Sequence, residues 1–329
     1  MATSNPSSNA RQSFVSPASP DDLPWLKDWY RHHTPITQAR LEPAGGEKAE
    51  LRFRRSIEDG CVVIANGFRG VQGVAALDLD SGEVWALAVA RRRPDTRHIQ
   101  PLMDAIERLA VAFCFDHITI EPVPDRSELL TGLGYRAPTR SASGRPALRR
   151  ALSRRWTRYG RRIRAIGAEL GIPSNYARRH RLRLQAESPR LESIGTDVFG
   201  REQRLTPPAA TAWRAMVETA ARAGTALQAV SAFRSVDYQA ALLRRKLEHG
   251  QKMEQILRVS AAPGFSEHHT GNALDITTPG AEPLEESFEH TRAFAWLCQH
   301  APAHGFRLSF PRENRHRLAY EPWHWCYRG

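Results

Sequence analysis

The stretch SEHHTGNALD, residues 266–275, places two adjacent histidines a few positions before an aspartate. Gly271 and Ala273 stand between them, and small residues of this kind allow the backbone to bend tightly. We therefore expect His268 and Asp275 to converge on one metal ion. A histidine-rich loop alone is more often a solvated surface, so the hypothesis requires further ligands elsewhere in the chain.

The stretch EPWH, residues 321–324, supplies the missing groups. A zinc hydrolase uses three protein ligands and leaves one position open for water. His324 offers a third ligand. Glu321, three residues earlier, offers a carboxylate that can face the water without binding the ion, as a general base must.

Three segments occur in the order SAFRSVDYQ (231–239), SEHHTGNALD and EPWH. They resemble the motifs S-x-x-R-S-x-x-x-Q, S-x-H-x-x-G-x-A-x-D and E-P-W-H of the zinc D-Ala-D-Ala carboxypeptidases of the VanY and VanX type. The zinc ligands that the resemblance implies are His268, Asp275 and His324. It also implies that Glu321 is the catalytic base and that Arg234 stabilises the oxyanion. The residues expected to bind substrate are Ser231, Gln239, Ser266 and Trp323. We expect His268, and not His269, to be the ligand.

The implied function is zinc-dependent hydrolysis of the C-terminal D-alanine of peptidoglycan-type peptides. The implied partners are peptidoglycan precursors or muropeptide stem peptides. An LD-carboxypeptidase or a D-Ala-D-Ala dipeptidase would use the same residues, so these alternatives stay open. A non-catalytic, zinc-stabilised binding module is a further alternative, because the hedgehog domains are similar in fold. Glu321 and Arg234 favour catalysis, since a structural zinc site needs neither.

The fold class we predict is α+β, with a hedgehog/DD-peptidase-like zinc domain at residues 191–329 and a GNAT-like α/β domain at residues 24–137. The order of strands and helices in the N-terminal domain, ending in LGYR (133–136), resembles the GNAT acetyltransferase fold. In that fold a glycine-rich turn at a helix N-terminus binds the pyrophosphate of acetyl-CoA. The equivalent stretch here, RRRPDTRHIQPL (91–102), contains no glycine. We therefore predict a degenerate GNAT-like domain and do not expect acetyl-CoA to bind.

The positive charge is concentrated between the two predicted domains. The chain has 47 Lys and Arg against 35 Asp and Glu, but residues 138–190 alone hold 15 basic and two acidic residues. We interpret residues 138–190 as an Arg-rich connector. Its amphipathic helix has an apolar stripe from Leu148 to Leu170, which we expect to pack on a neighbouring domain. A helix that binds nucleic acid or an anionic membrane is the alternative, but no nucleic-acid-binding motif accompanies the charge, so no specific nucleic acid is expected.

The chain contains no apolar run long enough to cross a membrane, and its start lacks the apolar region of a secretory signal. Residues 1–23 are rich in Ser and Pro, and we predict that they are disordered. The four cysteines show no CxxC spacing. We predict reduced thiols in a cytoplasmic protein.

Overall fold

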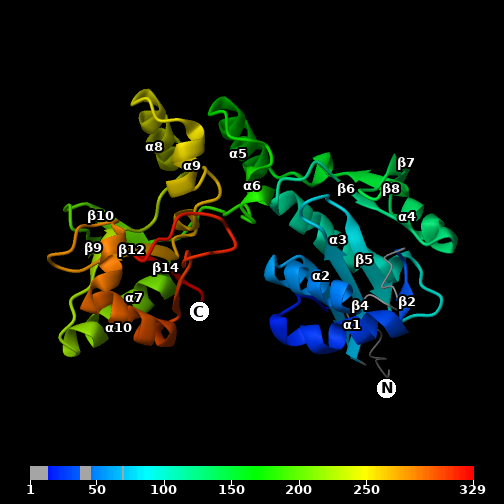
Figure 1. Ribbon diagram of the computed structural model, residues 1–329, viewed down its shortest axis with the longest axis horizontal. Coiled ribbons are helices and arrows are strands. Elements are labelled where there is room, and N and C mark those ends of the chain that lie inside the picture. Colours follow the sequence, from blue (N-terminus) through cyan, green and yellow to red (C-terminus); the bar gives the residue numbers. More distant parts are fainter. Residues whose placement is uncertain (1–13, 38–45, 69) are drawn as a thin grey trace, which may run out of the picture. The chain divides into compact units, whose positions relative to one another are not determined.

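The structure is a computed structural model that describes residues 14–37, 46–68 and 70–329 (Figure 1). The chain forms two compact units, Met1–Trp156 (unit 1) and Thr157–Gly329 (unit 2). The predicted connector, 138–190, is therefore shared between them. Its residues up to 156 belong to unit 1, and the remainder belongs to unit 2.

Unit 1 contains a five-stranded antiparallel sheet in the order β1-β3-β4-β5-β2. Its strands are β1 (Phe14–Pro17), β2 (Thr34–Pro35), β3 (Val62–Gly67), β4 (Gly70–Leu77) and β5 (Val84–Val89). Helices α1 (Leu23–His32) and α2 (Gly46–Glu58) place Leu26 and Phe53 in one apolar cluster with Val74 of β4. The neighbouring residue, Gly73, lies closely against Leu102 of α3 (Thr96–Ala112). Because adjacent residues of a strand point to opposite faces, α1 and α2 cover one face of the sheet and α3 the other.

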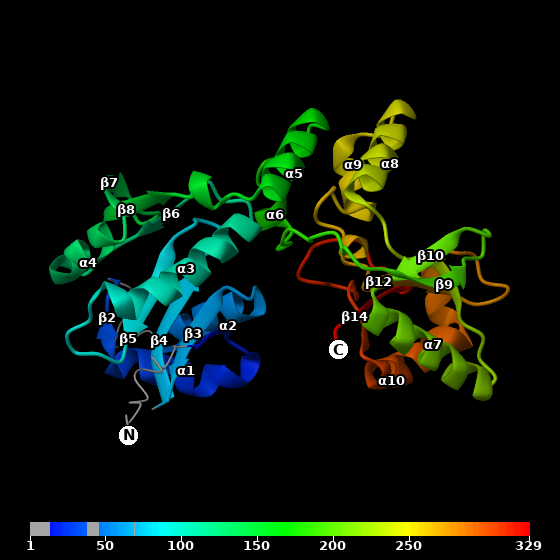
Figure 2. The same cartoon turned by 180° about the vertical axis from the view of Figure 1, so that it is seen from behind.

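A second, three-stranded sheet of unit 1 has the order β6-β8-β7. Its strands are β6 (His117–Ile120), β7 (Arg136–Arg140) and β8 (Pro146–Ala151), and α4 (Ser127–Gly132) precedes β7 (Figure 2). The prediction of one long amphipathic helix from Leu148 onward is wrong over these residues. In β8, Ala147 and Leu148 are both buried, and pairing with β6 and β7 determines the local structure in place of the helical spacing.

The prediction that residues 1–23 are disordered is wrong for their second half, while residues 1–13 lie outside the described residues. Phe14–Pro17 forms β1 and pairs antiparallel with β3. The partner strand lies about fifty residues further along the chain. The composition of the segment gives no sign of this partner, and for that reason it indicated disorder.

Unit 2 is built on a four-stranded antiparallel sheet in the order β11-β12-β14-β13. Its strands are β11 (Gln228–Ser231), β12 (Ala273–Thr277), β13 (Phe306–Leu308) and β14 (His324–Tyr327). A hairpin of β9 (Glu192–Thr196) and β10 (Glu202–Leu205) lies beside it. The helices of unit 2 are α5 (Arg158–Glu169), α6 (Tyr176–Arg179), α7 (Pro207–Arg222), α8 (Val236–Glu248), α9 (Met253–Val259) and α10 (Arg292–His300).

Alternation along two strands separates the apolar core of unit 2 from its polar face. Leu274 of β12 and Trp325 of β14 pack with residues of α7 and α10 in the apolar cluster. Asp275 directly follows Leu274 on β12, and His324 directly precedes Trp325 on β14. Both side chains therefore point to the opposite face of the sheet. They are partners in the β12–β14 register. The sheet thus places two of the predicted ligands side by side, away from the core.

The second half of the predicted connector packs against the loop that precedes His268. Gly264 has φ +86°, and an added Cβ there would approach Ile163 of α5 to 2.5 Å. The hydroxyl of Tyr176 accepts a hydrogen bond from the Ala262 N–H at 3.1 Å. The helix was predicted to pack on a neighbouring domain. In the structure, α5 and α6 pack on residues of their own unit, unit 2.

Within the described ranges, no helix combines the length and the apolar character that a membrane crossing requires.

Candidate metal centre and cleft

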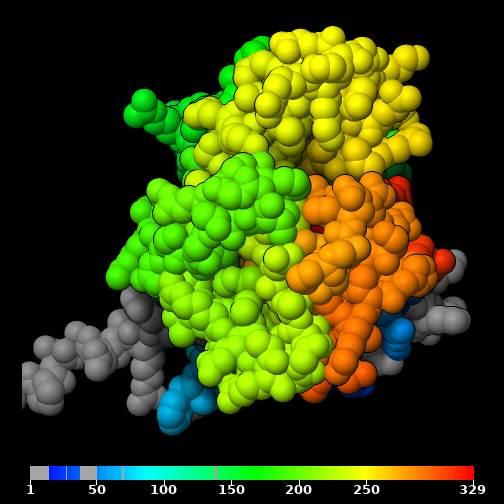
Figure 3. All heavy atoms as spheres, turned by 90° about the vertical axis from the view of Figure 1, so that its left-hand side faces the viewer, coloured from blue at the N-terminus to red at the C-terminus, as the bar shows by residue number. Residues whose placement is uncertain are grey.

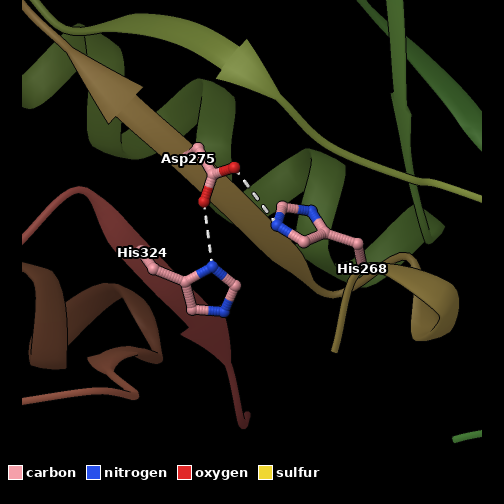
Figure 4. Close-up of side chains that lie close together, drawn as sticks. All are labelled: His268, Asp275 and His324. Carbon is pink, nitrogen blue, oxygen red and sulfur yellow. Dashed lines mark hydrogen bonds and ion pairs between the residues drawn. The ribbon is translucent and has the colours of Figure 1, made fainter. Parts of the chain in front are cut away.

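Three of the predicted residues converge in unit 2. Ligand atoms of His268, Asp275 and His324 all lie within 4.8 Å of one another, and all three side chains are buried (Figure 4). Asp275 stands on β12 and His324 on β14, while His268 comes from a 3-10 turn, η4 (Glu267–Thr270), which precedes β12. Gly271, with φ +68°, ends that turn and leads the chain into the strand. This is the left-handed backbone conformation that glycine adopts without steric cost.

The protonation of His268 is fixed by its neighbours. Nδ1 lies 2.6 Å from the carbonyl oxygen of Ala232, which can only accept, so Nδ1 carries the proton. Burial lowers the pKa of His268 to about 4, so the ring is neutral near pH 7. Nε2 therefore presents a lone pair to Asp275 Oδ2 at 3.2 Å and has no hydrogen-bond partner among the described residues. A lone pair that faces a carboxylate oxygen is unfavourable unless a cation lies between the two atoms, so this donor set fits a metal ion.

His324 contacts carboxylates through both ring nitrogens. Nδ1 lies 2.9 Å from Asp275 Oδ1, and Nε2 lies 3.2 Å from Glu267 Oε2. Burial alone would lower the pKa of His324, but these two carboxylates outweigh it and raise the pKa to about 10. The ring therefore carries a proton on both nitrogens near pH 7. An ion that binds at Nδ1 would displace the proton there, while Nε2–H continues to donate to Glu267.

Glu267 is the functional residue that the motif comparison missed. Its carboxylate accepts from Ser309 Oγ at 2.5 Å and pairs with Arg328, besides contacting His324. Burial would raise the pKa of Glu267, but His324 and Arg328 outweigh burial and hold the pKa well below its usual range. A carboxylate that accepts from the distal nitrogen of a ligand histidine orients that ring. The sequence signal for this role is the acidic side chain of Glu267 between the motif residues Ser266 and His268.

Asp275 contacts a cationic or hydrogen-bonding group through each carboxylate oxygen, in addition to the lone pair of His268. Burial would raise the pKa of Asp275, but His324, whose Nδ1 lies 2.9 Å from Oδ1, outweighs burial, and the pKa lies far below its usual range. Arg234 adds a further contact, Nη2 to Oδ2 at 3.8 Å. Asp275 is therefore ionised near neutral pH, as a carboxylate ligand must be.

Glu321 lies at the mouth of the group. The E-P-W-H segment forms a turn in which the His324 N–H donates to the Glu321 carbonyl at 3.1 Å, with Pro322 after the first residue, as suits a β-turn. Oε2 of Glu321 lies 3.8 Å from His324 Nδ1. Burial raises the pKa of Glu321 to about 7. Its carboxylate can therefore accept and return a proton near neutral pH.

A cleft of about 580 Å³ opens beside the three ligands. Of the site residues predicted from the sequence, those that line the cleft are Ser231, Arg234, Asp275, Glu321 and Trp323. Figure 3 shows the face of unit 2 on which the chain around α8 and α9, the β9–β10 hairpin and the segment before α10 meet. Lys246 of α8 also lines the cleft and was not predicted. Lys246 lies seven residues after Gln239 on α8, which is about two helical turns, so both residues share one face of the helix. This spacing could have indicated Lys246 from the sequence.

Two predicted substrate residues do not line the cleft. Gln239 is buried beneath it, where its Oε1 accepts from Arg234 Nη1 at 3.3 Å and its Nε2 donates to the Ala261 carbonyl at 2.8 Å. Ser266 is buried before η4. Gln239 therefore holds Arg234, which reaches the cleft, and does not line the cleft itself.

His269 lies outside the group, as expected. Its Nδ1 donates to the Arg234 carbonyl at 2.6 Å, and its Nε2 accepts from the Gly264 N–H at 3.0 Å. Both nitrogens are thus used to join the two loops that carry Arg234 and His268. Cys326, buried on β14, is not part of the group either.

Residues 202–329 match the family model described as D-alanyl-D-alanine carboxypeptidase, VanY. This C-terminal region belongs to the VanY family, a family of zinc peptidases. The putative carboxypeptidase YodJ of Bacillus subtilis (strain 168) is 35% identical to it over 126 residues, which cover 37% of this chain and 45% of YodJ. The match thus spans less than half the length of this curated relative.

Solved structures similar to unit 2 include two peptidases. The LdcB LD-carboxypeptidase is 30% identical, with 44% of this chain and 71% of that chain covered and a TM-score of 0.40. A variant of the vancomycin resistance D,D-pentapeptidase VanY, in complex with Zn(II), is 22% identical, with 44% and 80% covered and a TM-score of 0.35.

An acetyltransferase of the GNAT family from Bacillus cereus ATCC 10987 is also similar, at 15% identity and a TM-score of 0.29, with 42% of this chain and 94% of that chain covered. This likeness is too low to establish the fold of unit 1, so its GNAT-like character stays a prediction. At the N-terminus of α3, the Asp95 carboxylate accepts from the Arg97 N–H at 2.9 Å and pairs with the Arg97 guanidinium at 2.7 Å. A carboxylate therefore caps the helix end at which the GNAT fold would bind pyrophosphate.

Proposed function

We propose that unit 2 is a zinc-dependent carboxypeptidase that removes the C-terminal residue of peptidoglycan-type stem peptides. The observation that carries the proposal is the His268 Nε2 lone pair, which faces Asp275 Oδ2 at 3.2 Å without a hydrogen bond. Membership of the VanY family and the Zn(II) complex of a solved relative support zinc as the ion.

His268 Nε2, Asp275 and His324 Nδ1 would hold the zinc ion. When bound, zinc supplies a Lewis acid for the scissile carbonyl and makes a nucleophile of water near neutral pH. Glu321 accepts the proton of the attacking water and returns it to the leaving amine. Its raised pKa, about 7, matches that exchange, because a base works best when its pKa lies near the working pH.

Arg234 would bind the carbonyl oxygen as negative charge develops on it. Its Nη1 is held by Gln239 at 3.3 Å and its Nη2 lies 3.8 Å from Asp275, while its buried Nε has no hydrogen-bond partner in the described part of the chain. A preorganised donor of this kind contributes about 3 kcal/mol to stabilisation of the transition state.

Lys246 provides a second cation in the same cleft. Its Nζ donates to Ser260 Oγ at 2.8 Å, and among the described residues no carboxylate lies within ion-pair distance of it. Burial, together with Arg234, lowers the pKa of Lys246. A free carboxylate of the substrate would offset this uncompensated charge, so Lys246 would select peptides that end close to the scissile bond.

The cleaved bond is tested by incubating the zinc-loaded protein with tri-, tetra- and pentapeptide stems and weighing the products by mass spectrometry. Loss of one D-alanine from the pentapeptide supports a DD-carboxypeptidase. Cleavage of the tetrapeptide alone assigns LD specificity, and release of D-alanine from free D-Ala-D-Ala alone assigns a dipeptidase. If every peptide stays intact while zinc is bound, the proposal fails and unit 2 is a zinc-stabilised binding module.

A further inference from the structure

An arginine-lined cleft lies on the three-stranded sheet of unit 1, remote in sequence from the predicted peptidase residues. Its volume is about 660 Å³. Its charged lining consists of Arg136, Arg149, Arg150, Arg154 and Arg155, and the other lining residues are small and uncharged. None of the described residues that line the cleft carries a carboxylate.

Two of these arginines are neutralised by α3 and form the fixed part of the cleft. Arg150 Nε and Arg155 Nε lie 2.8 Å from the two carboxylate oxygens of Glu107, which is almost completely buried. Arg155 also pairs with Asp104 at 2.5 Å. Gly134, with φ +88°, leaves space for Arg150, because an added Cβ would lie 2.8 Å from its Nη1.

The other three arginines carry uncompensated charge. Arg136 of β7 and Arg149 of β8 are direct partners in the strand register, so their side chains lie on the same face of the sheet. Like charges directly opposite each other destabilise a pair of strands. Within the part of the chain that the structure describes, no carboxylate pairs with Arg136, Arg149 or Arg154, and Arg149 bonds only to the neutral acceptor Nδ1 of His117 at 2.9 Å.

We propose that this cleft binds a small free anion that carries phosphate. Guanidinium groups match phosphate oxygens with paired hydrogen bonds, and a phosphate between Arg136 and Arg149 would convert their repulsion into attraction. The cleft has the volume of a small-molecule site. The described lining residues include no aromatic ring on which a nucleic-acid base could stack, which argues against single-stranded nucleic acid.

The test is calorimetric titration of the whole chain with inorganic pyrophosphate. We expect saturable binding that weakens about tenfold or more in Arg136→Gln and in Arg154→Gln, because each change removes a charged donor. Arg92→Gln, a neutralisation of an exposed arginine in the stretch equivalent to the acetyl-CoA site, is the matched control and should leave the affinity within about twofold.

A second readout separates a ligand site from a structural role. Without pyrophosphate, Arg136→Gln should unfold at the same temperature as the wild type or higher, because it removes repulsion across the strands. A lower unfolding temperature would show that Arg136 stabilises the fold and would overturn the proposal. Equal loss of affinity in Arg92→Gln, absence of binding at millimolar pyrophosphate, or binding only to vesicles that contain anionic phospholipid would overturn it as well.

Discussion

His268 and His269 show how neighbouring histidines acquire different roles from their hydrogen bonds. The ring of His268 has one nitrogen on a carbonyl and leaves the other for an ion, whereas His269 uses both nitrogens between two loops. The sequence motif distinguishes them only by position. The physical distinction is the unpaired Nε2 of His268, which the structure alone displays.

Glu267→Gln should weaken zinc binding about 10- to 100-fold, because it replaces the carboxylate that orients His324 and holds its proton on Nε2. Zinc affinity measured by competition with a chelator checks this expectation. Glu282→Gln, a change at an exposed acidic residue of the same unit, should have no effect. An unchanged affinity in Glu267→Gln would show that Glu267 acts only on Arg328 and Ser309.

Lys246→Met should raise KM about tenfold or more for a stem peptide with a free C-terminus and leave kcat little changed, since it removes a binding contact remote from the reacting atoms. The same variant should cleave a C-terminally amidated peptide as poorly as the wild type does. Lys252→Met, at an exposed lysine just after α8, is the control. Equal effects on free and amidated peptides would exclude the carboxylate contact.

At the scale of elements, the turn between β9 and β10 depends on one buried carboxylate. Asp197 accepts from the Phe199 and Arg201 N–H groups at 2.8 and 2.9 Å and from the Arg201 guanidinium at 2.7 Å. Burial would raise the pKa of Asp197, but these donors outweigh burial and lower it. Because Phe199 and Arg201 line the peptidase cleft, this turn also shapes the site.

Asp197→Asn should lower the free energy of unfolding at pH 7 by about 2 kcal/mol, because hydrogen bonds to a charged group are lost. The difference in free energy of unfolding between the wild type and Asp197→Asn is complete above the unfolded-state pKa of aspartate, about 3.9. It disappears as the pH falls through the lower pKa of Asp197 in the folded state. Urea unfolding of both proteins at pH 7 and at pH 3 measures this. A difference that stays constant between the two pH values would exclude the ionised carboxylate as its source, and exposed Asp237→Asn is the control.

A local sequence signal suffices where no distant pairing competes with it. Thr206 and the two prolines that follow it stand at the start of α7 in the structure. The failures lie where pairing with distant residues decides the structure, as in β1 and β8. Of the site, the ligands followed from the motifs. Glu267 and Lys246 did not, because their roles depend on contacts across 57 residues of chain and on the shape of the cleft.

At the scale of the whole chain, the boundary of the peptidase unit is set by packing and not by composition. Residues 157–190 were predicted to be part of a connector, yet Ile163 and Tyr176 support the loop at residues 262–264 that leads into the metal-binding turn. The Gln185 N–H also donates to the Gly264 carbonyl at 2.8 Å. The unit that carries the chemistry therefore extends from residue 157.

A fragment of residues 157–329 should fold cooperatively and bind zinc, whereas a fragment of residues 191–329 should unfold at a lower temperature or aggregate, because it exposes the apolar surface that α5 and α6 cover. Circular dichroism during heating, with zinc content determined on the same samples, compares the two fragments. Equal unfolding temperatures and zinc contents would show that α5 and α6 are dispensable.

The most direct measurement is titration of the metal-free protein with zinc while release of the C-terminal residue from a stem peptide is followed. We predict that the rate rises to a plateau at about one zinc ion per chain, and that Glu321→Gln binds the same amount of zinc without measurable turnover. Turnover that is independent of zinc, or that persists in Glu321→Gln, would contradict a site in which His268, Asp275 and His324 hold the ion and Glu321 moves the proton.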